Sequence, residues 1–181
     1  MVRITKNIDE CVDEIKNGNV VVFPTETVYG MGTDIYNEIG VRKIFEYKKK
    51  PNFLPLIVHV HSFSQVPDLI TLDDTSLIFL KDVFEKLTPG PISFLLPKSD
   101  KVPDYVTANT SKVCIRIPSN DTALAFLKKV NTPICAPSAN SYCHASATCA
   151  NHILEDFSDL DILILDDMYK DTVIGIESTI V

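Results

Sequence analysis

Residues 8–24, with the sequence IDECVDEIKNGNVVVFP, contain the pattern that decides the fold. The i, i+3, i+4, i+7 spacing of an amphipathic helix is formed by Ile8, Cys11, Val12 and Ile15. We expect this helix to end at Gly18, because glycine commonly follows the last turn of a helix. The apolar run 19–23 then predicts a short buried strand, which Pro24 ends. A helix followed at once by an apolar strand is a unit from which α/β proteins are built.

The same alternation of helices and strands continues to the end of the chain. Further helices are predicted near residues 41–45, 77–87, 123–127 and 147–154. Further strands are predicted near residues 56–60, 92–96, 113–117, 132–136, 161–165 and 173–181. No internal repeat or shift of composition marks a boundary. The predicted fold class is therefore α/β (α+β), with residues 1–181 as a single three-layer domain around one sheet.

The composition excludes several classes of protein. Hydrophobic residues make up 45% and charged residues 23% of the chain, which is typical of a globular domain and not of a disordered tail. The longest apolar runs are the size of strands, far below the roughly 20 residues that cross a bilayer, so we expect no membrane partner. Residues 1–4 lead directly into the first helix without a signal peptide, and the five cysteines form no C-x-x-C pair. These features predict free thiols and a cytoplasmic location.

The charge argues against a protein that coats nucleic acid. Seventeen Lys and Arg residues and 24 Asp and Glu residues give a net charge of -7, whereas such proteins are usually basic. Five basic residues nevertheless lie within 42–50, and this local basic site suits a small polyanion such as a nucleotide phosphate. The alternative interpretation is a solvated helix end. No metal ligands are assigned, because the spacing of Cys143, His144, Cys149 and His152 matches no common zinc site.

Four polar segments next to predicted helices and strands are candidates for a site. They are PTETVYG at 24–30, KKKP at 48–51, the arginine of VCIRIP at 113–118, and PSANS at 137–141. The first lies where α/β sheets place ligands, although a capped turn is the alternative. The lysines of the second can bind phosphate oxygens. A buried arginine needs an anion, which is either a ligand or an internal carboxylate. The fourth offers backbone N–H groups to a phosphate.

Together with PLIVH at 55–59, PGP at 89–91 and ESTIV at 177–181, these segments resemble the YrdC-like family of threonylcarbamoyl-AMP synthases. The resemblance covers nearly the whole chain and implies a strongly twisted mixed sheet flanked by helices. It implies a nucleotidyltransferase that joins L-threonine, bicarbonate and ATP into threonylcarbamoyl-AMP, with Mg2+ accompanying the ATP. A transferase complex would then move the threonylcarbamoyl group to tRNA. The chain stops at Val181, so it resembles the short form of the family, which has no extra C-terminal domain.

The resemblance also assigns roles to individual residues. The expected catalytic residues are Lys48, Lys50 and Arg116. The expected ATP-binding residues are Lys48, Lys50, Lys112, Ser138, Asn140 and Ser146. The expected threonine-binding residues are Thr27, His59, Arg116 and Ser178. On its pattern alone, a histidine within a strand, such as His59, is more often a packing residue than a catalyst.

The chain departs from the family pattern at four positions. Lys50 replaces an arginine, Leu54 an asparagine near the nucleotide, and Lys112 a serine or threonine, while Tyr142 stands where glycine is usual. Two alternatives therefore remain open: an inactive member of the family, and a non-enzymatic RNA-binding module that uses residues 42–50. A carbamoyl-adenylate activity, like that of the related domain of the hydrogenase-maturation carbamoyltransferase, is disfavoured because no C-x-x-C zinc finger occurs in the sequence.

Overall fold

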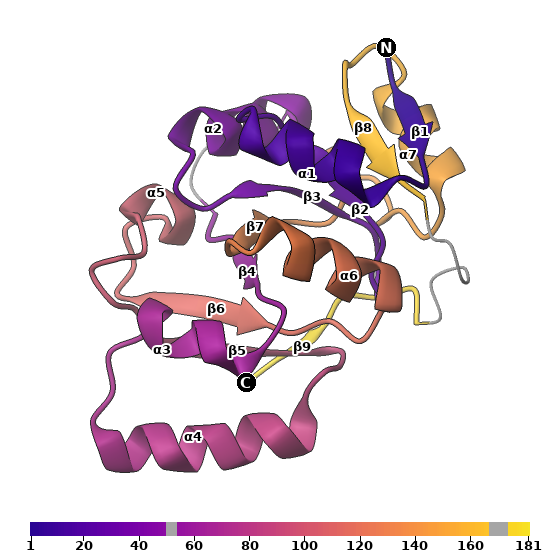
Figure 1. Ribbon diagram of the computed structural model, residues 1–181. Coiled ribbons are helices and arrows are strands. Elements are labelled where there is room, and N and C mark those ends of the chain that lie inside the picture. Colours follow the sequence, from indigo (N-terminus) through magenta and orange to yellow (C-terminus); the bar gives the residue numbers. More distant parts are fainter. Residues whose placement is uncertain (50–53, 167–173) are drawn as a thin grey trace.

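The computed structural model describes residues 1–49, 54–166 and 174–181, and its strands form one mixed sheet (Figure 1). In this part of the chain nine strands follow the order β1-β8-β2-β3-β7-β4-β6-β5-β9. The strands are β1 (Arg3–Thr5), β2 (Val21–Phe23), β3 (Gly30–Asp34), β4 (Ile57–His59), β5 (Ile92–Pro97), β6 (Lys112–Arg116), β7 (Ile134–Ala136), β8 (Leu163–Leu165) and β9 (Thr179–Ile180). Parallel pairs such as β4–β6 and antiparallel pairs such as β5–β6 both occur, which confirms the mixed sheet.

Helices cover this sheet, and several begin at a polar residue that caps them. The helices are α1 (Ile8–Lys16), α2 (Glu38–Tyr47), α3 (Val66–Leu69), α4 (Asp74–Leu87), α5 (Asp104–Thr107), α6 (Asp121–Val130) and α7 (Ala150–Phe157), with a 3-10 turn at Phe63–Gln65. The side chains that accept a backbone N–H bond at the start of α1, α2, α4 and α6 are Asn7, Asn37, Asp73 and Asn120. Such caps satisfy N–H groups that have no partner within the helix. None of the described helices is long and apolar enough to cross a membrane.

The two faces of β2 pack against different helices, and this arrangement produces three layers. Val21 and Phe23 lie in a core cluster with residues of α1 and α6. Val20 and Val22 lie in another cluster, with residues of α2 and α7. Successive side chains of a strand point to opposite faces of the sheet. An uninterrupted apolar run is therefore what a strand buried on both faces requires.

The half of the sheet formed by β4, β5 and β6 has one face in an apolar core cluster and carries several polar side chains on the other. Val58, Phe94 and Ile115 belong to one core cluster with residues of α3 and α4. The residues that alternate with them point to the opposite face of the sheet. His59 and Arg116 are on this second face, which carries the candidate site.

Two strands of the structure are absent from the sequence prediction. The sequence pattern leads residues 1–4 directly into the first helix, but Arg3–Thr5 forms β1, which pairs in parallel with β8. Gly30–Asp34 forms β3, although glycine is unfavourable in strands. A glycine is needed within β3, because a Cβ atom on Gly32 would lie 2.7 Å from the Cγ2 atom of Ile134.

Two other predicted elements are shorter or shifted. The helix predicted near 147–154 is α7, which begins only at Ala150. The strand predicted near 173–181 is reduced to β9 at Thr179–Ile180, and residue 173 lies outside the described residues. Both differences concern the ends of elements rather than their existence.

Candidate active site

Three polar side chains lie next to one another on neighbouring strands. Arg116, the last residue of β6, is in register with His59 of β4 on one side and with Ser93 of β5 on the other. All three are buried. Residues in register on neighbouring strands have side chains on the same face, so the sheet itself aligns this row of polar groups.

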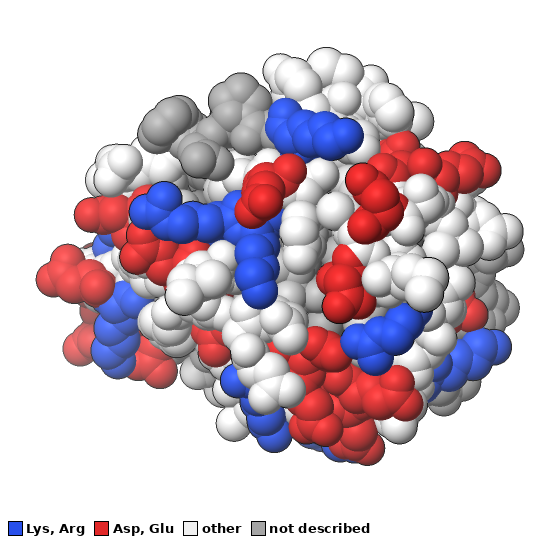
Figure 2. Space-filling model, turned by 90° about the horizontal axis from the view of Figure 1, so that it is seen from above, with Lys and Arg blue, Asp and Glu red and all other residues white. Residues whose placement is uncertain are grey.

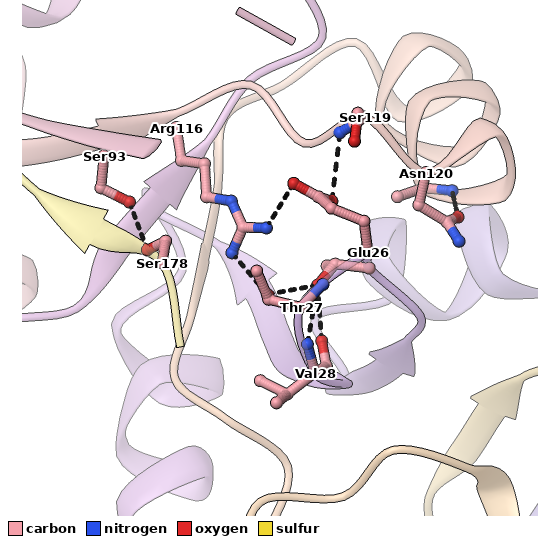
Figure 3. A network of polar contacts seen from close by, with 10 residues as sticks. Glu26, Thr27, Val28, Ser93, Arg116, Ser119, Asn120 and Ser178 are labelled. Carbon is pink, nitrogen blue, oxygen red and sulfur yellow. Dashed lines mark hydrogen bonds and ion pairs between the residues drawn. The ribbon is translucent and has the colours of Figure 1, made fainter. Parts of the chain in front are cut away.

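A carboxylate from the first polar segment neutralises Arg116 (Figure 3). The Nη2 atom of Arg116 donates to Oε1 of Glu26 at 2.7 Å, and its Nη1 atom donates to Oγ1 of Thr27 at 2.9 Å. The second oxygen of Glu26 accepts the backbone N–H of Ser119 at 3.1 Å. The internal carboxylate, one of the two anions that the sequence allows for Arg116, is therefore present. The site prediction did not include Glu26. An arginine inside an apolar strand was nevertheless a reason to search the polar segments for a carboxylate.

The hydroxyl groups of Thr25 and Thr27 have fixed roles. Thr25 Oγ1 donates its only proton to the carbonyl of Val28 at 2.6 Å. In the 2.9 Å contact between the two hydroxyls, Thr27 must consequently be the donor. Thr27 Oγ1 in turn accepts from Arg116. This network holds Thr27, a predicted threonine-binding residue, against the guanidinium group.

Two buried nitrogen atoms of this site have no hydrogen-bond partner among the described residues. They are Nδ1 of His59 and Nε of Arg116. Burial, and after it the positive charge of Arg116, lowers the pKa of His59 from 6.5 to about 3, so its ring is neutral at pH 7. The ring of Phe23 meets the His59 ring edge-on at a centroid distance of 5.7 Å. Because unpartnered buried polar atoms are costly, these two nitrogens point to a ligand.

The last described segment of the chain covers the first polar segment. Ile174 and Gly175 donate backbone N–H bonds to the carbonyls of Glu26 and Thr27, both at 3.0 Å. These bonds bring Ser178 to the polar row, where its hydroxyl lies 2.7 Å from that of Ser93 (Figure 3). The four predicted threonine-binding residues are thus brought together.

A small cavity of about 50 Å3 lies between these segments. Its walls include Thr27, His59, Arg116 and Ser178, together with Ser138 from the PSAN segment. The predicted threonine-binding residues therefore share one cavity with a predicted ATP-binding residue.

Lys48 holds the PSAN segment in place. Its ammonium group donates to the carbonyls of Ser138 and Asn140, both at 2.5 Å, and lies 3.3 Å from Oδ1 of Asn140. The segment also continues the sheet, since Ala139 N–H donates to the Tyr29 carbonyl at 2.7 Å. Lys48, Ser138 and Asn140 are thus together, as predicted, but the lysine is buried and its hydrogen bonds go to the loop.

The other predicted ATP-binding residues are placed differently. Ser146 donates to the Glu177 carboxylate, next to Ser178. Lys112 is exposed at the opposite end of β6 from Arg116 and is not part of the cavity wall, so its role stays a prediction. Lys50 lies outside the described residues. Leu54 lines a separate cavity of about 380 Å3 between α2 and α5.

One residue in the loop after PSAN has a backbone conformation in the left-handed region. The positive φ of 67° belongs to Cys143 rather than to Tyr142, the residue that stands where the family pattern has glycine. A non-glycine residue is strained in this conformation. The strained backbone of this loop is therefore at Cys143 and not at Tyr142.

Of the basic residues at 42–50, Lys49 is exposed and Lys50 lies outside the described residues, whereas the other three have partners. Arg42 is paired with Glu38 at 2.6 Å, Lys43 donates to Asn19 at 3.2 Å, and Lys48 is turned inward. On the face seen in Figure 2, lysine and arginine side chains are interspersed with aspartate and glutamate. This distribution does not favour the RNA-binding alternative.

No group of three or more potential metal-ligating His, Cys, Asp or Glu side chains occurs in the described residues. Burial raises the pKa of Cys114, next to the site on β6, to about 11, so this thiol stays protonated at pH 7. A thiol is a weak nucleophile in that form.

The chain is similar to several known proteins. A family model for Sua5, YciO and YrdC proteins, described as "Telomere recombination", matches residues 13–181. The threonylcarbamoyl-AMP synthase of Pyrococcus abyssi is 39% identical over 168 residues, covering 92% of this chain and 48% of that protein. The enzyme of the same name from Bacillus subtilis is 38% identical over 167 residues, covering 92% and 47%.

A solved structure of P. abyssi Sua5 complexed with L-threonine has a TM-score of 0.88 and 35% identity to this chain. It aligns with 99% of this chain and with 53% of the solved chain. The chain therefore spans about half the length of these relatives.

Proposed function

Since the chain belongs to the Sua5/YciO/YrdC family, we propose that it forms threonylcarbamoyl-AMP from L-threonine, bicarbonate and ATP. The observation that carries this proposal is the shared cavity, whose walls include His59 and Arg116, the two residues with unpartnered buried nitrogens. The proposed product would serve the modification of tRNA through a downstream transferase complex. The five free cysteines fit a reducing, cytoplasmic setting.

The amino-acid end of the cavity suits a small zwitterion. Nε–H of Arg116 is a buried donor without a partner, and a substrate carboxylate is the acceptor that such a group binds best. Nδ1 of the neutral His59 and the hydroxyl of Ser178 would bind the remaining polar groups of threonine. Glu26 already balances the charge of Arg116, and Glu177, which also lines the cavity, adds a negative charge there.

The other end of the cavity suits a nucleotide phosphate. Ser138 lies in the cavity wall there, and Asn140 is on the same loop, whose shape Lys48 fixes by three contacts. Because these contacts occupy the ammonium group, Lys48 contributes mainly by holding the loop and by its positive charge. Loops that present hydroxyl and backbone N–H groups are common phosphate sites.

The proposed reaction has two steps. The neutral amine of threonine attacks the carbon of CO2 and loses a proton, or attacks the carbon of bicarbonate, from which water leaves; either route gives a carbamate. A carbamate oxygen then attacks the α-phosphorus of ATP, and the bond to the β-phosphate breaks so that pyrophosphate leaves. Holding the two reactants next to each other supplies part of the barrier reduction, of the order of several kcal/mol. No protein nucleophile is required, which agrees with the protonated Cys114.

Mg2+ would enter with the ATP. Such an ion is often held mainly by phosphate oxygens and water with few protein ligands. The ion would supply positive charge to the triphosphate. The protein's own part is to orient the substrates and to exclude water.

The test is pyrophosphate release from ATP, with threonine and bicarbonate omitted one at a time. We expect release only when both are present. Release that needs carbamoyl phosphate would support the carbamoyl-adenylate activity instead. RNA binding without any release would support the RNA-binding module, and neither activity would support an inactive member of the family.

A further inference from the structure

Asp156 connects α7 to the loop that follows PSAN. Its Oδ2 atom accepts the backbone N–H of Ser141 at 2.8 Å, and its Oδ1 atom lies 2.6 Å from Nδ1 of His144. The carboxylate is 14% exposed, whereas the imidazole is 62% exposed. The carboxylate is therefore a mostly buried anchor with both of its oxygens bound to the loop.

The same loop residues carry Asn140. The amide nitrogen of Asn140 donates to the carbonyl of Ser141 at 2.9 Å and to that of His144 at 2.8 Å. Its Oδ1 atom accepts the hydroxyl of Ser138 at 2.6 Å. Asp156 thus contacts Ser141 and His144, the two residues whose carbonyls bind the Asn140 side chain. Lys48 binds the loop separately, through the backbone carbonyl of Asn140.

The position of Asp156 in its helix is unfavourable without these contacts. It lies in the last turn of α7, where the helix dipole presents partial negative charge. A carboxylate there is destabilising unless other groups neutralise it. A residue that conflicts with its own helix but is satisfied by a functional loop is often kept for that loop.

We propose that Asp156 is a positioning residue for the nucleotide-binding loop, an inference that rests on the proposed function. It fixes the backbone of Ser141 and the ring of His144, and through them the side chain of Asn140. It does not touch the nucleotide. Its loss should therefore weaken ATP binding and leave threonine binding unchanged.

The test compares Asp156→Ala with Asp156→Asn. Alanine removes both contacts, whereas the asparagine amide can still accept from Ser141 and donate to a neutral His144. The control is Glu155→Ala, an exposed acidic residue in the same turn of α7. KM for ATP and for threonine are measured by pyrophosphate release, and amide hydrogen exchange is measured on peptides covering residues 138–148.

We expect Asp156→Ala to raise KM for ATP at least tenfold and KM for threonine less than twofold, with faster exchange in the loop. Asp156→Asn should stay within about threefold of the wild type, and Glu155→Ala should not differ from it. If Asp156→Ala does not fold, His144→Ala removes one of the two contacts and should raise KM for ATP several-fold.

Three results would overturn the inference. Asp156→Ala could leave KM for ATP and loop exchange unchanged, or it could raise both KM values equally. Both Asp156 variants could also lower KM for ATP, in which case the carboxylate merely repels the nucleotide. A wild-type protein that releases no pyrophosphate would instead refute the proposed function, and the exchange data on the variants would still decide whether Asp156 positions the loop.

Discussion

Arg116 is a full positive charge with only 3% of its surface exposed, and Glu26 is the carboxylate that balances it. Removing one partner of a buried ion pair leaves an uncompensated charge, which typically costs about 3–5 kcal/mol. We expect Glu26→Ala to lower the free energy of unfolding by about that amount in urea titrations. Glu38→Ala, which breaks the exposed pair with Arg42, should cost less than about 1 kcal/mol. Equal losses in the two variants would contradict the burial of the Glu26 pair.

The depressed pKa of His59 predicts how stability depends on pH. The folded protein keeps the ring neutral down to about pH 3, whereas the unfolded chain protonates it below about pH 6.5. Between these values the unfolded state binds more protons, so stability falls as the pH falls, by at most about 1.4 kcal/mol for each pH unit. In His59→Gln, urea titrations at pH 4–7 should show a free energy of unfolding that lacks this contribution to its pH dependence. An unchanged pH dependence in that variant would show that the ring is accessible to protons.

At the level of single residues, the sequence indicates which kind of group a side chain must contact better than it indicates which residue supplies that group. Arg116 is conspicuous because an arginine inside an apolar strand requires an anion. The sequence leaves open which anion, and the structure identifies Glu26, which is 90 residues away along the chain. Likewise, no local pattern indicates that Asp156 contacts Ser141. Both partnerships depend on how distant segments pack.

At the level of elements, β3 depends on a close approach of its neighbours. A Cβ atom on Gly32 would lie 2.7 Å from Ile134 Cγ2 and 2.9 Å from Phe23 Cε1. Overpacking of this kind costs about 1–3 kcal/mol. We expect Gly32→Ala to lower the midpoint of urea unfolding accordingly, while Met31→Leu, a volume-conserving change next to it, should cost less than about 1.5 kcal/mol. If Gly32→Ala left the midpoint of urea unfolding unchanged, β2 and β7 would have to be able to move apart at no cost.

The elements that the sequence predicts are those with a strong apolar period. Residues 8–16 and 74–87 form helices where the spacing indicates them, and the apolar run 19–23 gives β2. β1 is mostly exposed and β3 contains two glycines, so neither has the apolar pattern of a strand. Both exist because neighbouring strands offer backbone hydrogen bonds, which a sequence pattern does not contain.

At the scale of the molecule, Lys48 connects the end of α2 by hydrogen bonds to a loop about 90 residues later in the chain. Without it, the PSAN segment loses its buried anchor at the nucleotide end of the cavity. We expect Lys48→Ala to reduce pyrophosphate release at least about tenfold, which corresponds to about 1.4 kcal/mol. The exposed neighbouring variant Lys49→Ala should retain wild-type release. Equal activity of the two variants would contradict the assigned role of Lys48.

The convergence of segments in the whole molecule follows from the sheet order. The sequence places PTETVYG, RIP and PSAN beside predicted strands, but it does not give the order of those strands. The pairing of β4 with β6 brings His59 beside Arg116, and the pairing of β4 with β7 places Ile57 beside Ala136, the residue before the PSAN loop. The family resemblance supplied this arrangement as an expectation. Composition and periodicity alone led only to a three-layer fold around one sheet.

The most direct measurement is a crystal structure of the protein soaked with L-threonine. We predict that the amino acid lies between Arg116 and Ser178, that its carboxylate accepts from Arg116 Nε, and that a polar atom lies within hydrogen-bond distance of His59 Nδ1. Threonine bound elsewhere, or a cavity that stays empty at saturating threonine, would contradict the account.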